Sequence, residues 1–311
     1  MTATIVPLGK QRSPDRPGPG PMPDALLRAL DITIARRISG LLAGDYRSSR
    51  LGRGTELAQI REYVWGDDVR QIDWNVTARM NTPHVRVQIA ERVLTTWLVL
   101  DISASMAFGT ADRRKTDVAE GVALATGHIA TRRGNSLGVI TFGEDQPRIH
   151  PPAQGRAGMM GLLTALREEP PAPGGNPASL GSVLRTTSSL ARQSKLIVVV
   201  SDFRGSRDWR EPMIDLCGRH SVIAVEIQDP REQDLPNVGE LWLVDPESGR
   251  QLRVDTARKR VRERFAEAAA AERADVAREL TSIGAQHVVL STAGDWLRTF
   301  AGFLVQNGAV R

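Results

Sequence analysis

The feature that most constrains the fold is an almost unbroken apolar strand that ends in a carboxylate. The stretch LVLDISASMAFG, residues 98–109, is apolar until Asp101, and Ser103 and Ser105 then follow at alternate positions. A strand without a polar face is buried on both sides, which is typical of the parallel sheets of α/β proteins. The sequence therefore predicts that Asp101 lies at the carboxyl end of a central strand.

From Asp101 onward, strand-like and helix-like segments alternate. The alternation predicts an α/β fold with a mostly parallel, doubly wound sheet and helices on both faces. Residues 239–256 alternate around an ESG turn and predict a hairpin inserted into this domain. The expected strands cover 136–143, 195–202, 221–229 and 286–292, and the expected helices cover 114–133, 157–168, 180–192, 209–219, 256–283 and 296–305.

The chain divides into three parts by composition and pattern. Residues 1–23 are rich in Pro and Gly and are predicted to form a disordered tail. Residues 24–94 contain a helix-like segment from Leu26 to Leu42 and then an irregular segment rich in Gly, Asp and Arg. The α/β domain is expected to cover residues 95–305.

Composition is that of a globular protein, with 41% hydrophobic and 25% charged residues. The net charge of +5 is spread over interleaved charges, and no recognition helix, aromatic platform or zinc spacing indicates nucleic-acid binding. The single cysteine, Cys217, is interpreted as a small core side chain and is typical of a reducing compartment. No apolar run approaches the ~18 residues of a membrane helix, and the start lacks a signal-peptide pattern. We expect a cytoplasmic protein without a membrane span.

Two carboxylates end two apolar strands: Asp101 in VLD and Asp202 in VVSD. In open α/β sheets, ligands bind outside the carboxyl ends of strands where the strand order reverses. If both strands flank that point, the carboxylates face one crevice and repel each other unless a cation or protons intervene. With the hydroxyls of Ser103 and Ser105 they form the kind of oxygen cluster that binds Mg²⁺ or Mn²⁺. The alternative is that the carboxylates cap helices and hydrogen-bond to the serines without metal.

Two segments resemble known families. DISAS (101–105) and Asp202 in VVVSDF resemble the metal-ion-dependent adhesion site of von Willebrand factor type A domains. Residues 52–93 resemble the signature of domain-of-unknown-function family 58 (DUF58), and the resemblance covers residues 24–305. The matching signature residues are Arg61, Tyr63, Gly66, Asp67, Asp68, Arg70, Asp73, Trp74 and Arg79.

The DUF58 resemblance implies a type A-like α/β fold and an association with MoxR-type AAA+ ATPases, whose genes usually neighbour those of the family. It leaves the biochemical activity and the client protein undefined. Some members of the family carry transmembrane helices. The adhesion site usually takes a Thr from a Gly-rich turn, and here Asn176 stands in that turn. The metal ligand set implied by the resemblance is Asp101, Ser103, Ser105, Asn176 and Asp202.

The segment WGDDVRQIDW within the signature has three interpretations. The favoured one is structural packing, with Arg70 and Arg79 as ion-pair partners and with Trp65 and Trp74 anchored against a core. The second is docking of a partner protein. The third is acid-pair catalysis by Asp67, Asp68 and Asp73.

Enzyme templates are absent, because the sequence has no Walker loop, G-x-G-x-x-G, G-x-S-x-G or H-E-x-x-H. The sequence therefore predicts a non-catalytic interaction module that binds its partner at the crevice around Asp101, Ser103, Ser105 and Asp202, where a divalent metal can complete the contact. The DUF58 resemblance implies that the module acts as an adaptor or co-chaperone-like partner of a MoxR-type ATPase. One alternative is a metal-dependent phosphohydrolase with Asp101 as nucleophile, although such sites carry a second acid where this chain has Ser103. The other alternative is a metal-free scaffold with a vestigial site.

Overall fold

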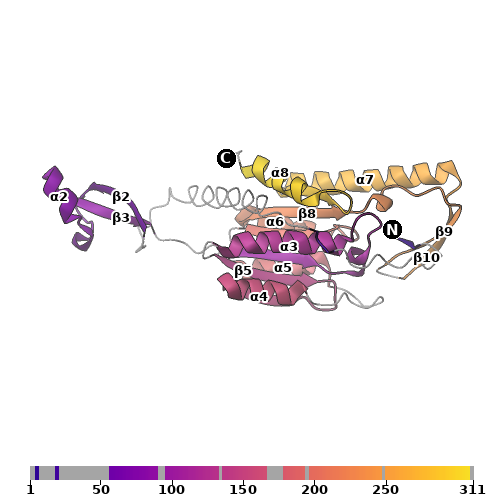
Figure 1. Cartoon of the computed structure of the whole chain (residues 1–311), viewed down its shortest axis with the longest axis horizontal. Helices are drawn as coiled ribbons and strands as arrows, with labels where there is room; N and C mark the ends of the chain where they lie inside the picture. Colours follow the sequence, from indigo (N-terminus) through magenta and orange to yellow (C-terminus); the bar gives the residue numbers. More distant parts are fainter. Residues whose placement is uncertain are drawn as a thin grey trace. The chain divides into compact units, whose positions relative to one another are not determined.

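The computed structural model describes residues 4–6, 18–20, 56–89, 95–132, 135–166, 178–192, 196–246 and 249–308 (Figure 1). The chain separates into two compact units. One comprises residues 1–38 and 94–311, and the other comprises residues 39–93. Each unit is described by itself.

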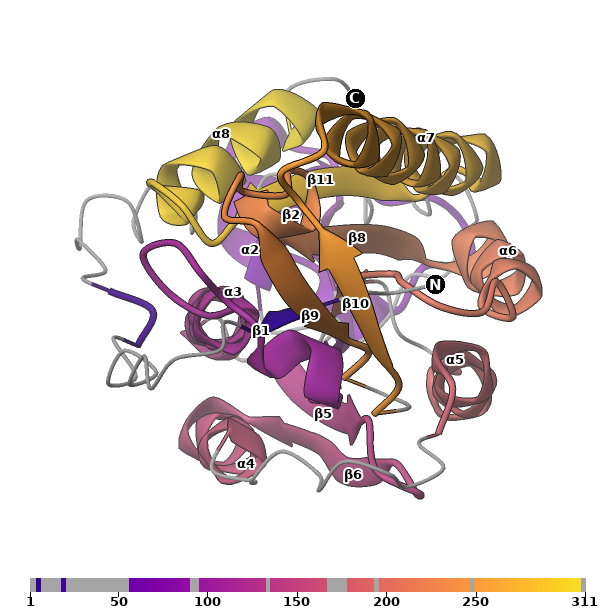
Figure 2. The same ribbon diagram turned by 90° about the vertical axis from the view of Figure 1, so that its right-hand side faces the viewer.

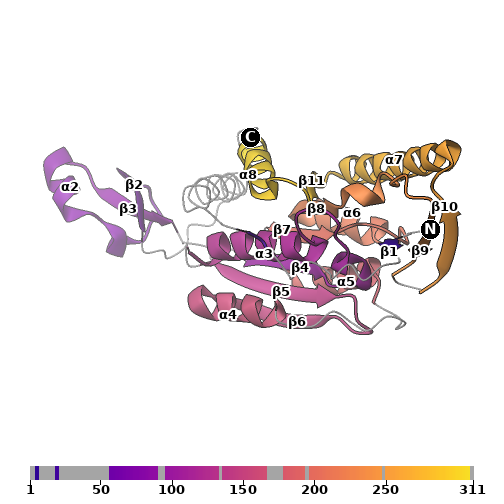
Figure 3. The same cartoon turned by 45° about the vertical axis from the view of Figure 1, so that its right-hand side comes forward.

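A six-stranded sheet forms the centre of the larger unit (Figure 3). Its neighbouring strands pair in parallel, except that the edge strand β6 is antiparallel to β5. The sheet has the doubly wound order, which reverses between β4 and β7. This confirms the predicted fold class. In spatial order the strands are β11 (Gln286–Ser291), β8 (Ser221–Gln228), β7 (Leu196–Ser201), β4 (Thr95–Asp101), β5 (Ser136–Phe142) and β6 (Arg148–Gln154).

Helices cover both faces of this sheet (Figure 2). One face carries α3 (Lys115–Arg132), α4 (Gly155–Leu166) and α8 (Trp296–Gly308). The other carries α5 (Leu180–Leu190), α6 (Arg210–Arg219) and α7 (Lys259–Ile283). Among the described residues, none of the helices has the length and apolar character needed to cross a bilayer.

The central strand β4 is buried on both sides, as its apolar sequence predicts. Leu98 and Leu100 pack into the core beneath α3 and α8, whereas Trp97 and Val99 pack into the core beneath α5 and α6. Successive side chains of a strand point to opposite faces, so a strand between two helical layers needs apolar residues at every position.

Two short parts of the Pro/Gly-rich N-terminal segment, residues 4–6 and 18–20, are described, and the tail over residues 1–23 stays a prediction. β1 (Thr4–Val6) pairs antiparallel with β9 (Glu240–Val244), which forms a hairpin with β10 (Gln251–Asp255) where the alternating pattern predicts one. The Pro19 carbonyl accepts a hydrogen bond of 2.9 Å from the indole N–H of Trp296. These partners lie more than 200 residues away in sequence, so local composition does not indicate them.

The smaller unit contains two antiparallel strands, β2 (Glu56–Glu62) and β3 (His84–Ile89). The segment between them forms a 3₁₀ turn, η1 (Val69–Gln71), and the short helix α2 (Trp74–Met80). We call the described residues 56–89 the signature unit. The helix expected from Leu26 to Leu42 lies outside the described residues.

We predict that Leu98→Ala lowers the free energy of unfolding by about 2–5 kcal/mol, because it opens a cavity at a fully buried position of the central strand. Val289→Ala on β11 is the matched control, since Val289 is 41% exposed, and should cost less than about 1 kcal/mol. Urea denaturation followed by circular dichroism measures both. Equal losses in the two variants would contradict the placement of β4 at the centre of the core.

Candidate functional site

The carboxyl ends of β4 and β7 bring Asp101 and Ser201 together. The Ser201 hydroxyl donates a hydrogen bond of 2.5 Å to Asp101 Oδ2. The backbone N–H of Ser103 donates to the other carboxylate oxygen, Oδ1, at 2.9 Å. Both carboxylate oxygens of Asp101 thus accept a hydrogen bond from the protein, and the residue is only 6% exposed.

The turn after β4 places the two predicted serines side by side. Ser103 precedes the 3₁₀ turn η2 (Ala104–Ala107), and its hydroxyl oxygen lies 3.1 Å from that of Ser105. Gly143, at the end of β5, has a φ of +123°, and a Cβ built there would lie 2.4 Å from the Ser103 nitrogen. Only glycine permits this close approach of the two loops.

The backbone after β7 folds tightly around Asp202. Phe203 has a φ of +53°, which is rare for a residue with a side chain. Its N–H donates to the Ser201 hydroxyl at 3.1 Å, and the N–H of Arg204 donates to Asp202 Oδ1 at 3.1 Å. The buried Phe203 ring packs edge-on against Trp209, with 5.7 Å between centroids, and this packing holds the strained conformation.

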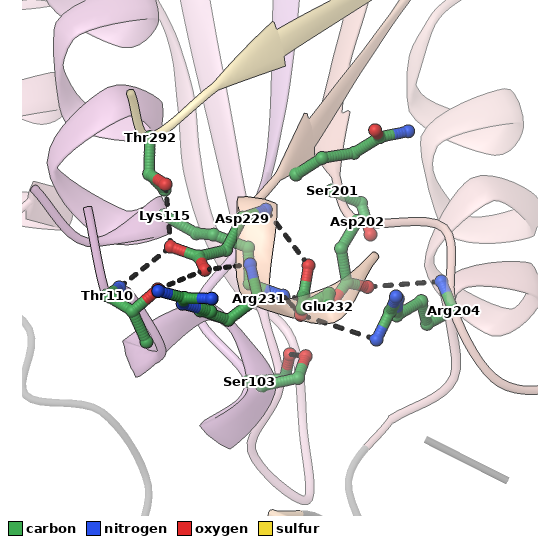
Figure 4. Close-up of polar contacts among 12 residues, drawn as sticks. Ser103, Thr110, Lys115, Ser201, Asp202, Arg204, Asp229, Arg231, Glu232 and Thr292 are labelled. Carbon is green, nitrogen blue, oxygen red and sulfur yellow. Dashed lines mark hydrogen bonds and ion pairs between the residues drawn. The ribbon is translucent and has the colours of Figure 1, made fainter. Parts of the chain in front are cut away.

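A buried lysine binds the second carboxylate (Figure 4). Lys115, the first residue of α3, is fully buried, and its Nζ lies 2.7 Å from Asp202 Oδ2. The same Nζ lies 2.8 Å from Oε1 of Glu232 in the 3₁₀ turn η3 (Pro230–Glu232). The guanidinium of Arg204 approaches the same Glu232 oxygen at 3.4 Å. Sequence reasoning missed Lys115 and Glu232, which join Asp202 only through tertiary structure.

Asp229 fixes the turn that carries Glu232 (Figure 4). This fully buried carboxylate accepts hydrogen bonds from the backbone and hydroxyl of Thr110, at 2.7 and 2.5 Å, and from the Thr292 hydroxyl, at 2.7 Å. Asp229 also forms a capping box with Glu232. The loops after β8 and β11 are thereby tied to the segment that precedes α3.

In the signature unit, the side chains of Asp67, Asp68 and Asp73 hold the local backbone. Asp67 accepts two hydrogen bonds of 2.7 Å from Arg61, which hold the pKa of Asp67 below its usual range. Asp73 caps α2 and pairs with Arg86 at 2.8 Å, and this pairing lowers the pKa of Asp73. Asp68 caps η1. The ion-pair partners are thus Arg61 and Arg86, which corrects the expectation of Arg70 and Arg79.

The tryptophans of the signature are exposed, which corrects the expectation that they anchor the segment against a core. Trp65 is 95% exposed and Trp74 is 70% exposed. Trp65 precedes Gly66, whose φ of +106° forms the turn that the Arg61–Asp67 pair closes. Tyr63 joins this turn to the strand pair through its N–H, which donates to the Pro83 carbonyl at 2.8 Å. Val64, Val69 and Met80 are also exposed.

Comparison with known proteins agrees with the signature. The family described as "Protein of unknown function DUF58" matches residues 59–275. The chain belongs to the DUF58 family. Its relatives include the Mycobacterium tuberculosis protein "Uncharacterized protein Rv1480" and the Mycobacterium bovis protein "Uncharacterized protein Mb1516". Each is 41% identical over 283 residues, which cover 90% of this DUF58 chain and 88% of the relative.

Two solved structures are similar in fold. BatB from Bacteroides thetaiotaomicron has a TM-score of 0.46 and 13% identity, and the match covers 70% of this DUF58 chain and 100% of BatB. A von Willebrand factor type A protein from Catenulispora acidiphila has a TM-score of 0.39 and 13% identity, and the match covers 71% of this chain and 43% of that protein.

The two carboxylates of the DUF58 site differ in their protonation. Burial, with a further contribution from the negative charge of Asp202, raises the pKa of Asp101 to about 7. Burial also acts to raise the pKa of Asp202, but the Lys115 ammonium outweighs it and holds that pKa below its usual range. Burial acts to lower the pKa of Lys115, and Asp202 and Glu232 together raise it above its ordinary value.

Two of the predicted metal ligands are spaced as ligands of a divalent cation would be, whereas the charge of a third is already paired. The 3.1 Å between the Ser103 and Ser105 hydroxyls matches two adjacent ligands of an octahedral ion. Asp202, however, is already neutralised by Lys115. Among the described residues, no group of three or more His, Cys, Asp or Glu side chains is arranged to hold a metal. Asn176 lies outside the described residues. The metal site stays a prediction.

Cys217 packs on α6 against the core, as its sequence context predicts. Burial raises the pKa of its thiol to about 11. A thiol that stays protonated at neutral pH is a poor nucleophile, so its role is packing.

We predict that Asp101→Asn gains stability relative to the wild type as the pH rises from 5 to 8. The native state of the wild type holds a proton on Asp101 up to about pH 7, whereas the unfolded state loses it near pH 4. Wild-type stability therefore falls over this window as pH rises, and an Asn has nothing to titrate. The difference in the free energy of unfolding should reach the order of 2–4 kcal/mol. Urea titrations at several pH values measure it.

Asp234→Asn is the control for this pH series, because Asp234 is exposed. The free energy of unfolding of Asp234→Asn should change with pH in the same way as that of the wild type. Parallel curves for Asp101→Asn and the wild type would show that Asp101 is ionised throughout.

Proposed function

We propose that this DUF58 chain is a non-catalytic cytoplasmic adaptor that docks on a MoxR-type AAA+ ATPase through its signature unit. The observation that carries the proposal is the exposure of Trp65 and Trp74 within a segment whose backbone is held by the side chains of Asp67 and Asp73. The α/β fold and family membership support an interaction module. The ATPase as partner rests on the family resemblance, and the cytoplasmic location rests on the single cysteine.

The signature unit is preorganised for binding. The Arg61–Asp67 pair closes the turn that displays Trp65, and Asp73 caps the helix that begins with Trp74. A rigid surface loses little conformational entropy on association, so more of the contact energy appears as affinity. Tryptophan is among the residues most enriched at the energetic centres of protein interfaces.

The same structure argues against a phosphohydrolase. A nucleophilic carboxylate must be ionised and free to attack, whereas Asp101 has both oxygens hydrogen-bonded and a pKa raised to about 7 by burial. Ser103 stands where a second acid would assist the leaving group. A scaffold with a vestigial strand-edge site remains the competing function, and mutation of the signature unit distinguishes it.

We predict that Trp65→Ala and Trp74→Ala each weaken binding to a purified MoxR-type ATPase by at least about tenfold, because each removes a large exposed anchor. Folding should be unaffected, within ~0.5 kcal/mol, since neither indole packs in a core. Biolayer interferometry measures the affinity, and thermal unfolding checks stability.

Trp242→Ala is the matched control, because it makes the same change on β9 in the larger unit, where Trp242 is 39% exposed. It should bind like the wild type. Wild-type affinity in both signature variants would refute docking through these tryptophans. If the wild type itself does not bind the ATPase, the assigned partner is wrong.

A further inference from the structure

Two buried carboxylates beside the sheet edge are paired with two cations. Asp202 and Glu232 carry two negative charges at 5% and 2% exposure. Lys115 and Arg204 supply two positive charges within 4 Å of them. A buried carboxylate needs a cation or hydrogen-bond donors in place of water, and Asp202 and Glu232 have both cations close by.

Three separate segments contact Lys115, one through its backbone and two through its ammonium group. Its backbone N–H donates to the Phe108 carbonyl at 2.9 Å, which fixes the start of α3. Its Nζ then sits between one oxygen from the end of β7 and one from η3, at 2.7 and 2.8 Å. Two carboxylate oxygens from different elements thus converge on a single positive centre.

A divalent cation beside Asp202 and Glu232 would also meet the two cations that already pair with these carboxylates. It would be repelled by Lys115 and Arg204, and inside a protein such repulsion is strong because screening is weak. Beyond the cluster, Asp101 would offer one ionised oxygen ligand at most, and the serine hydroxyls are neutral. The geometry of Ser103 and Ser105 alone does not offset this.

We propose that the Lys115 ammonium is the resident cation of this edge. It occupies the position that the Asp202 and Glu232 oxygens would otherwise offer to a divalent cation, so these two carboxylates need no metal ion in the wild type. Removal of the ammonium leaves two buried carboxylates facing one vacated space. Hard divalent cations bind such paired oxygens. A surface pocket lined by Asp202 and Glu232, together with Arg204 and Glu226, gives an ion and its waters access to both carboxylates.

The test compares the wild type, Lys115→Ala and Lys115→Ala/Glu232→Gln in Mn²⁺ and in chelator at neutral pH. Mn²⁺ binding is read by electron paramagnetic resonance of the free ion, and stability by thermal unfolding. The wild type should bind no Mn²⁺ and melt at the same temperature in both buffers. Lys115→Ala should bind one Mn²⁺ at concentrations at least about tenfold below those at which the wild type shows no binding, and should melt at a higher temperature with the ion than without it. The double variant, which lacks one carboxylate charge, should lose both effects.

Either of two results would overturn the proposal. One is stoichiometric Mn²⁺ binding by the wild type that Ser103→Ala/Ser105→Ala abolishes, because the serines would then hold a metal beside the lysine. The other is a folded Lys115→Ala that binds no Mn²⁺. If Lys115→Ala unfolds in both buffers, Lys115→Met, which keeps most of the side-chain volume, replaces it with the same criteria. Because partner binding is not measured, these outcomes are independent of the adaptor function.

Discussion

The ion pairs of Lys115 with Asp202 and Glu232 hold together the loops at the carboxyl ends of the β-strands in the larger unit. They join the first residue of α3, the residue after β7 and the η3 turn, three segments that no local contact holds next to one another. Their formation removes all three charges from water, so any conformation that breaks one pair leaves a buried charge unpaired. Burial is the main cause of the raised pKa of Asp101, and the negative charge of Asp202, held in this arrangement, adds to it.

Most of the larger unit's architecture could be predicted from the sequence, because it follows from periodicity. A strand such as 196–201, apolar at every position, fits only between two helical layers. The positions of Asp101 and Asp202 at strand ends follow from the same pattern. What could not be predicted is the pairing across long separations: Lys115 lies 87 residues from Asp202 and 117 from Glu232. Nothing in the sequence around a lysine indicates that it will be buried.

In the signature unit, side chains that were expected to be buried are exposed. Its tryptophans are interpreted from sequence as core anchors, since large apolar side chains are usually buried. The unit of 34 described residues forms only two strands, a 3₁₀ turn and one short helix, and leaves both indoles exposed. The charges that read as a catalytic acid cluster serve instead to cap helices and close a turn. The polar residues of a motif can therefore fix its backbone while its apolar residues stay exposed to a binding partner.

The edge strand β6 limits how other chains can associate with the sheet. Pro151 and Pro152 lie within it, beside the irregularity in its pairing with β5. Neither has an N–H, so a strand laid along this edge would find no regular ladder of donors. Many proteins recruit partners, or aggregate, by extending a sheet at an open edge. Here that route is blocked at β6, and recognition at this side of the domain has to use side chains instead of backbone.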